Sequence, residues 1–115
     1  MSLAEEIKTA LLQSDVTPLQ QHLLRELAQR PLTASVLAIQ LGQLHHVTVN
    51  NALDNLGRSV RKHLNAHPEG LADGDYQWWN IVATGQQLPK GFEWTLRPEV
   101  VTAISELGWL AEHDF

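Results

Sequence analysis

The stretch TASVLAIQLGQLHHVTVNNALDNLGRSVRKHL, residues 33–64, decides the fold of this chain. Leu37 and Leu41 lie four positions apart, which puts them on one face of a helix. Thr33 precedes this helix, and its hydroxyl can accept a hydrogen bond from an N–H group of the first turn. Gly42 follows it, and glycine tolerates the left-handed backbone at which many helices end. The first half of the stretch therefore predicts a short helix between Thr33 and Gly42.

A second, longer helix is expected over residues 47–66. Its apolar residues repeat at spacings of three and four, and they are Val49, Ala52, Leu53, Leu56, Val60 and Leu64. Thr48 is expected to cap its first turn, and Pro68 prevents the helix from continuing further. A turn over residues 43–47 would join the two helices and present the second one outward.

The other face of the second helix is polar. It carries Asn50, Asn51, Asp54, Asn55, Arg58, Arg61 and Lys62. Asparagine can pair with the edge of adenine through two hydrogen bonds, and arginine and lysine neutralise phosphates, so this face has the residue types that read a DNA major groove. Any long helix on a small domain also has a solvated polar face, and at this point that plainer interpretation stays open.

Two further helices are expected ahead of this pair. Residues 3–13 and 18–29 both repeat apolar side chains at helical spacing. Thr17 followed by Pro18 is a strong helix start, because the threonine hydroxyl can cap the helix and proline lacks an N–H group that would need a partner. Together with the pair described above, this predicts three successive helices over residues 18–66.

Beyond the third of these helices the pattern changes. Residues 76–84, YQWWNIVAT, are rich in aromatic and β-branched side chains at the length of a strand. Residues 92–96, FEWTL, alternate apolar and polar side chains, and residues 85–91 between the two segments contain the proline and glycines typical of a turn. We therefore expect a β-hairpin, followed by a last helix over residues 98–112.

Three helices followed by a β-hairpin are the order of elements in the winged helix-turn-helix superfamily, and the phrase TASVLAIQLGQLHHVTVNNALDNLGRSV resembles the helix pair of its bacterial regulators. The resemblance covers residues 17–97. It implies a single, mainly α domain with a small β-hairpin, made of a three-helix core over residues 17–66 and a wing over residues 76–97. Residues 1–16 and 98–112 would add a helix at each end.

The resemblance also implies a DNA-binding transcriptional regulator of the bacterial cytoplasm. Residues 47–66 would be the recognition helix in the major groove, and residues 85–91 would place the wing on the DNA backbone. The residues expected to face DNA are Thr48, Asn50, Asn51, Asn55, Arg58, Arg61, Lys62 and Lys90. A homodimer would read two half-sites about one helical turn apart. The alternative is a winged-helix module that binds another protein and no DNA.

Charge favours neither alternative decisively. A net charge of −5 is unusual for a protein that coats nucleic acid, because an acidic surface repels phosphate. Residues 43–67, however, contain three basic residues and one acidic residue, whereas residues 98–115 contain four acidic residues and no lysine or arginine. The basic segment is compatible with one DNA-facing side, and the acidic last helix favours a protein partner.

Adjacent tryptophans at positions 78 and 79 add a second possible interface. Adjacent residues of a strand point to opposite faces of a sheet, so one of the pair is expected to pack on the helices with Trp94 or Phe92. The other is either covered by the last helix and its Trp109 or exposed to a partner. In the second case Trp78, Trp79 and Trp109 would form a protein interface, such as that of a homodimer.

Catalytic and metal-binding chemistry has little support. The chain has no cysteine, and no nucleophile or phosphate-binding motif and no membrane-spanning run is recognisable. His63 and His67 share a helix face, but a zinc site needs a third ligand that no spacing supplies. Asp73 and Asp75 lie in a glycine-containing loop without the rest of a calcium-binding pattern. We therefore expect a non-enzymatic cytoplasmic protein without a metal or cofactor.

Overall fold

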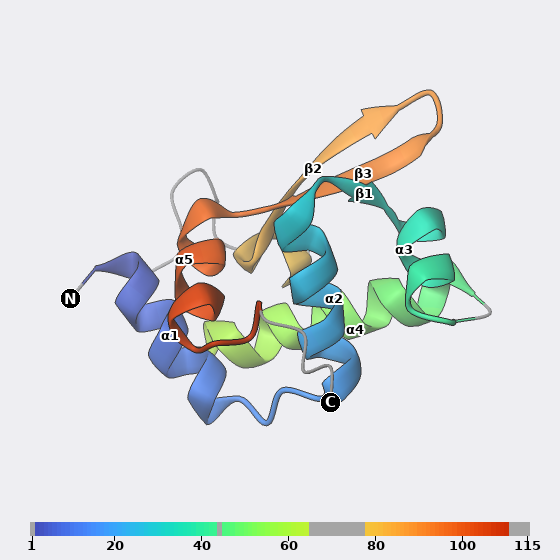
Figure 1. Ribbon diagram of the computed structural model, residues 1–115. Coiled ribbons are helices and arrows are strands. Elements are labelled where there is room, and N and C mark those ends of the chain that lie inside the picture. Colours follow the sequence, from blue (N-terminus) through green and yellow to red (C-terminus); the bar gives the residue numbers. More distant parts are fainter. Residues whose placement is uncertain (1, 44, 65–77, 111–115) are drawn as a thin grey trace.

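The helices and strands occur largely in the order predicted from the sequence. The computed structural model describes residues 2–43, 45–64 and 78–110. Within them the elements are α1 Leu3–Gln13, α2 Pro18–Gln29, β1 Leu32–Thr33, α3 Ala34–Gln40, α4 His46–Arg61, the 3₁₀ helix η1 Trp78–Ile81, β2 Ala83–Leu88, β3 Gly91–Leu96 and α5 Pro98–Glu106. Figure 1 shows α1 and α5 together at one end of the molecule, and α3 and the tip of the β2–β3 hairpin at the other. The prediction of a mainly helical fold with a small β-hairpin is confirmed.

Three of the helices begin at a hydroxyl cap. The side-chain oxygens of Ser2, Thr17 and Thr33 accept a backbone N–H three residues further on, at 3.2, 3.1 and 3.3 Å. In α2 the side chain of Gln20 also accepts the backbone N–H of Thr17 at 3.0 Å, so two N–H groups at this helix start are satisfied reciprocally. The caps predicted at Thr17 and Thr33 are confirmed.

The bounds of α4 differ from the prediction at both ends. The helix begins at His46, and His45 in the cap position makes no side-chain hydrogen bond. Thr48 lies inside the first turn, where its N–H donates to the carbonyl of His45 at 3.2 Å, so the predicted cap at Thr48 is wrong. The helix ends at Arg61, whose Nη1 donates to the carbonyl of Leu64 at 3.1 Å. The prediction that the helix continues to residue 66 is therefore wrong at residues 62–64, and residues 65–66 lie outside the described residues.

The helices α3 and α5 end in the same way. Gly42 and Gly108 follow their last turns with φ angles of 70° and 76°. The next residues, Gln43 and Trp109, each donate their N–H to the carbonyl five residues earlier, at 2.9 Å. This closure satisfies carbonyls that a helix end leaves free, and it favours glycine because φ is positive. The predicted end at Gly42 is confirmed. The predicted last helix is wrong beyond Glu106, because Gly108 ends it; residues 111–112 are not described.

The sheet is antiparallel, with the strands in the order β1–β3–β2. Its first strand has only two residues and pairs with the middle of β3, so it leaves no recognisable pattern in the sequence. The other two strands pair along their whole length and leave only Pro89 and Lys90 in the turn. The predicted turn over residues 85–91 is therefore wrong. Backbone pairing with β3 keeps residues 85–88 in the strand although most of their side chains are exposed and polar.

The predicted strand over residues 76–84 is wrong at residues 78–81, which form η1 against α4, while residues 76–77 lie outside the described residues. Two contacts with α4 explain the difference. The Oδ1 atom of Asp54 accepts the N–H of Trp79 at 3.0 Å. The carbonyl of Trp78 lies so close to Gly57 that a side chain there would overlap it. These tertiary contacts override the β propensity of the segment.

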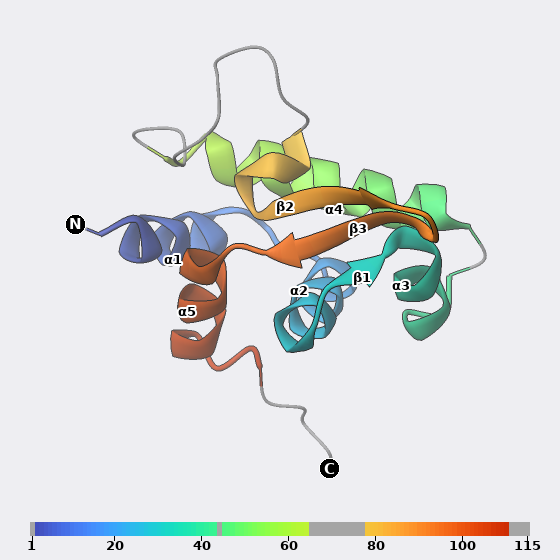
Figure 2. The ribbon, with the colours of Figure 1, turned by 90° about the horizontal axis from the view of Figure 1, so that it is seen from above.

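The core lies among the helices and the base of the hairpin. Figure 2, seen from above, shows the hairpin running between α4 and the helices α2 and α3. The largest fully buried side chains are Ile7, Leu11, Leu23, Leu24, Leu37, Leu53, Leu56, Ile81, Ile104, Val49, Val60 and Val82. Every helix and both ends of the described chain contribute to this set, so the helices added at either end belong to the same hydrophobic core.

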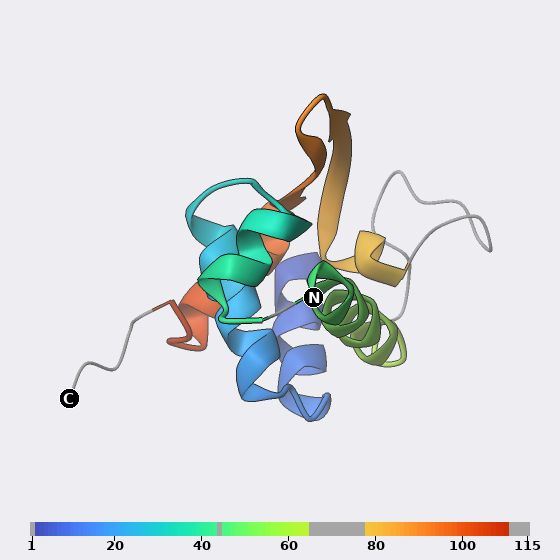
Figure 3. The ribbon, with the colours of Figure 1, turned by 90° about the vertical axis from the view of Figure 1, so that its right-hand side faces the viewer.

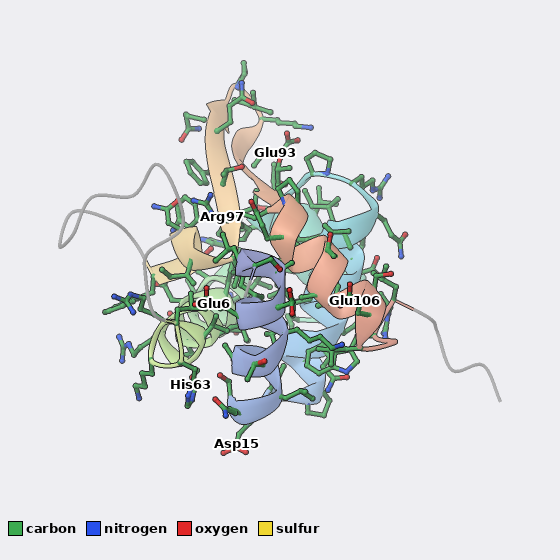
Figure 4. The ribbon with its side chains drawn as sticks, turned by 90° about the vertical axis from the view of Figure 1, so that its left-hand side faces the viewer. Glu6, Asp15, His63, Glu93, Arg97 and Glu106 are labelled. Carbon is green, nitrogen blue, oxygen red and sulfur yellow. The ribbon has the colours of Figure 1, made fainter. Side chains whose placement is uncertain are left out.

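Arg97 connects the hairpin to the helices. Figure 4 shows it where β3 passes into α5. Its Nε donates to the carbonyl of Asn80 in η1 at 2.8 Å. Burial lowers the pKa of its guanidinium, and the neighbouring charge of Glu99 opposes this shift. The bond therefore holds η1 against the base of the hairpin, and no sequence pattern predicted this role.

Candidate nucleic-acid interface

One face of α4 is exposed along the whole helix. Thr48, Asn51, Asn55, Arg58 and Lys62 follow one another at spacings of three and four, and all five are exposed. These residues, which we call the outer stripe, lie on one side of the helix because that spacing matches its turn. Figure 3 looks nearly along α4 and shows the hairpin rising above this helix. The stripe thus presents amides, a hydroxyl and two cations on the outside of the molecule.

Two other residues of α4 that were predicted to face DNA lie apart from the outer stripe. Asn50 is half-buried and lines a groove beside the hairpin. Arg61 is also half-buried, and its Nη1 is engaged with the carbonyl of Leu64. A phosphate contact therefore has better geometric support at Arg58 and Lys62 than at Arg61.

The hairpin turn carries the last of the predicted residues, Lys90. Its side chain is 65% exposed, and its Nζ lies 3.1 Å from Oε2 of Glu93 on β3. Exposed ion pairs of this kind contribute at most about 1 kcal/mol. Lys90 can therefore exchange the carboxylate for another anion at low energetic cost.

The adjacent tryptophans have different surroundings. The guanidinium of Arg58 lies 5.6 Å from the ring centre of Trp78, which is 36% exposed. A guanidinium at this distance from a ring face is attracted to it by a cation–π interaction. Trp79 packs with Phe92 and Trp94 instead. One tryptophan therefore packs as predicted, although the pair lies in η1 and not in a strand. Trp109 is partly buried against the core.

A groove with a volume of about 470 Å³ separates the hairpin from the N-terminal ends of α3 and α4. One wall is aromatic: Trp79, Phe92 and Trp94 meet with ring centroids 5.3 to 6.4 Å apart. The facing wall is polar. Its side chains are those of Ser35, His46, Asn50 and Asp54. Among the residues predicted for DNA contact, Asn50 and Lys90 line this groove, whereas the five residues of the outer stripe do not.

The sequence contained one signal for this groove. Gly85 pairs with Trp94 across the hairpin, and a side chain at position 85 would overlap the ring of Phe92. A glycine within a strand often marks a place where another group approaches the backbone closely. Because residues 85–91 were interpreted as a turn, this glycine was assigned to the turn and the aromatic wall was not anticipated.

Other kinds of site receive no support from the described residues. No three histidine, aspartate or glutamate side chains in residues 2–43, 45–64 and 78–110 lie close enough together to hold a metal ion. His67, Asp73 and Asp75 lie outside these ranges. Among the helices described, none is both long and apolar enough to cross a bilayer.

Comparisons with known proteins do not assign the chain to a family. Neither a protein-family model, nor a curated protein, nor a solved structure matches it. The outer stripe, the hairpin turn and the groove are therefore interpreted from their own geometry and chemistry.

Proposed function

We propose that this protein is a winged-helix module that binds double-stranded DNA, with α4 in the major groove. The observation that carries the proposal is the outer stripe. Its five exposed residues include two asparagines, which can read base edges, and two cations, which can contact phosphates. All five are exposed residues of one face of α4 and its C-terminal cap, and one of them, Arg58, also contacts Trp78 of η1.

The arrangement of the neighbouring elements supports the same function. The helices α2, α3 and α4 precede the β2–β3 hairpin, as expected for a winged helix, with the short strand β1 before α3 and the 3₁₀ helix η1 before the hairpin. The hairpin turn with Lys90 lies at the same end of the molecule as the start of α4. A duplex on the outer stripe would therefore pass its backbone close to Lys90.

Different residues of the stripe would have different roles. Asn51 and Asn55 would contact base edges and supply sequence preference. Arg58 and Lys62 would contact phosphates and supply most of the affinity, which depends strongly on salt. The cation–π contact of Arg58 with Trp78 would favour one position of its guanidinium before DNA binds.

The test is fluorescence anisotropy of a labelled pool of random duplexes at about 50 and 200 mM salt, a range over which phosphate contacts are revealed. The parent protein should bind, and its affinity should fall steeply with salt. Arg58→Gln combined with Lys62→Gln should weaken binding to all duplexes and reduce the salt dependence by about two phosphate contacts.

The matched control is Lys8→Gln combined with Arg25→Gln on α1 and α2, which changes the net charge by the same amount away from the stripe. This control should bind almost as the parent does. Equal losses in the two double variants would mean that net charge, and not the stripe, governs binding. A parent protein that binds no duplex at low salt would contradict the proposal.

Exposed apolar side chains support a second candidate function, the binding of another protein. Ile39, Val47 and Val36 are 78%, 51% and 41% exposed on α3 and at the start of α4. Such residues are found at protein interfaces, including those of homodimers. Analytical ultracentrifugation tests whether these residues form a homodimer contact. If the parent is a dimer and Ile39→Ser is a monomer, the contact lies on α3. A monomeric parent would exclude self-association through α3.

A further inference from the structure

The groove between the hairpin and the ends of α3 and α4 combines three features of a built binding site. Its volume of about 470 Å³ falls within the range of about 300–1,000 Å³ that is usual for small-molecule pockets. One wall is formed by aromatic rings and the other by polar side chains. Small-molecule sites have this composition, because apolar walls supply affinity and a few polar groups fix orientation.

The aromatic wall is suited to a flat ligand. Phe92 is 37% exposed, and its ring meets that of Trp79 at 65° with a centroid distance of 5.3 Å. Gly85 lies behind both rings, and because it has no side chain the rings can lie against the strand backbone. The wall is therefore a ring surface that is open on the groove side and supported from behind.

The polar wall offers both kinds of hydrogen-bonding group. Asn50 supplies an amide, which can donate and accept at once. Asp54 uses Oδ1 to accept the N–H of Trp79, and this bond orients its carboxylate beside the groove. Amino groups of bases are recognised by such carboxylates, and adenine edges by asparagine.

One buried donor in the groove lining has no partner. Trp94 is 3% exposed, and its indole N–H has no hydrogen-bond acceptor within the part of the chain that the structure describes. A buried donor without an acceptor is destabilising, so this indole N–H marks Trp94 as a strained element of the groove lining.

We propose that this groove binds a nucleobase. The aromatic wall stacks on the flat ring, and Asn50 and Asp54 contact its amino and ring-nitrogen edge. The base comes either from a strand of bound DNA, in which it is unpaired and turned out of the stack, or from a free nucleoside. A base from bound DNA requires the proposed DNA binding, whereas a free nucleoside does not.

The location of the groove favours the first source. Asn50 of α4 and Lys90 of the hairpin turn both line the groove, so the backbone of a duplex bound to α4 and to this turn would pass close to it. An unpaired base can leave the stack at small cost and enter a pocket that stacks on it. A paired base cannot do so without breaking its pairing.

Three duplexes that share one sequence show how much of the affinity for DNA comes from a base in the groove and how much from the other contacts. The first is fully paired, the second has one extra adenosine, and the third has one extra abasic sugar, which bends the backbone but offers no base. The parent protein should bind the adenosine duplex about tenfold more tightly than the abasic one, because stacking of a base on an aromatic side chain contributes affinity of this order.

Two substitutions in the groove test whether it causes the preference for the adenosine duplex. Phe92→Leu keeps an apolar side chain but removes the ring, and Asn50→Leu removes the amide. Both should lose the tenfold preference, and Phe92→Leu should bind the fully paired duplex as the parent does. Arg58→Gln with Lys62→Gln should weaken all three duplexes equally and retain the preference. Equal binding of the adenosine and abasic duplexes, or a preference that survives both groove variants, would overturn an extruded base as the ligand.

Free deoxynucleosides test the second source without DNA. At millimolar concentration they should shift the indole N–H resonance of Trp94 in the parent protein and not in Phe92→Leu. A shift in a protein that binds no duplex would support the groove and contradict the proposed DNA binding. Nucleobase binding is refuted if the resonance does not move and the adenosine and abasic duplexes bind equally.

Discussion

The two ends of the molecule are built differently. At the end formed by α1, α5, η1 and the C-terminal half of α4, apolar side chains such as Ile7, Val60 and Ile104 are completely buried. At the end formed by α3, the start of α4 and the hairpin turn, Ile39 and Val47 are 78% and 51% exposed. The first we call the packed end and the second the open end.

We infer from this difference that the packed end mainly stabilises the fold and that the open end mainly serves binding. Burial of apolar surface is the main favourable contribution to folding, so the packed end is expected to dominate the stability of the domain. The open end contributes less to the core, and it contains most of the groove lining, the hairpin turn and part of the outer stripe. Substitutions of exposed side chains at the open end should therefore change binding with little effect on folding, whereas Leu37 and Val49 at the same end are completely buried.

The largest expected effect is a loss of stability on substitution in the packed end. Ile104→Ala should reduce the free energy of unfolding by about 2–5 kcal/mol, because it leaves a cavity among fully buried side chains. Ile39→Ala at the open end should change it by no more than about 0.5 kcal/mol. Urea denaturation of the two variants measures both values. Similar losses in the two variants would contradict the division of the molecule into these ends.

The next effect compares two glycines. Gly57→Ala should cost about 1–3 kcal/mol, because the new methyl group meets the backbone carbonyl of Trp78, which is held by the packing of η1. Gly85→Ala should cost less, because its methyl group meets the partly exposed ring of Phe92, which can move into solvent. Thermal unfolding followed by circular dichroism ranks the two; a less stable Gly85→Ala variant would show that the aromatic wall is as rigid as η1.

A smaller effect concerns base recognition by the open end. Asn51→Ala should lower the discrimination between preferred and unrelated duplexes by about 1 kcal/mol, the lower end of what a bidentate base contact supplies. Its affinity for unrelated duplexes should stay close to that of the parent. Selection of preferred sequences from a random pool measures this, and an unchanged preference would remove Asn51 from base contact.

The smallest expected effect is a pH dependence at the first helix. The backbone N–H and then the side chain of Ser2 hydrogen-bond to the carboxylate of Glu5 and lower its pKa below the ordinary 4.5. A lowered pKa stabilises the fold above pH 4.5, and this contribution disappears as the pH falls through the folded-state pKa. Glu5→Gln should thus be slightly less stable than the parent at neutral pH and equal to it at strongly acidic pH. Urea midpoints at both pH values provide the check, and a constant difference would contradict it.

The sequence predicted the helices well where their ends have local chemical causes. Thr17 with Pro18, Thr33 and Gly42 each act within one turn of their own position, and the structure has caps or ends at all of them. Gly108 closes α5 by the same mechanism as Gly42. It was missed because apolar residues continue beyond it at helical spacing.

Prediction failed where distant segments determine the backbone. The segment of Trp78 and Trp79 has strand-like composition, but Asp54 and Gly57 of α4 hold it in a 3₁₀ helix. These contacts cross more than twenty positions of the chain. The groove was missed for the same reason, since its walls come from α3, α4, η1 and the hairpin. All five residues of the outer stripe were in the predicted set, because helical spacing alone brings them together, but that set also included the half-buried Asn50 and Arg61.

The most direct test of the proposed function is the map of backbone amide resonances that shift when a short duplex is added. The account predicts shifts at the outer stripe of α4 and at Lys90 in the hairpin turn, with α1 and α5 unaffected. Shifts confined to α1 and α5, or no shifts at low salt, would contradict the assignment of DNA binding to the open end and α4.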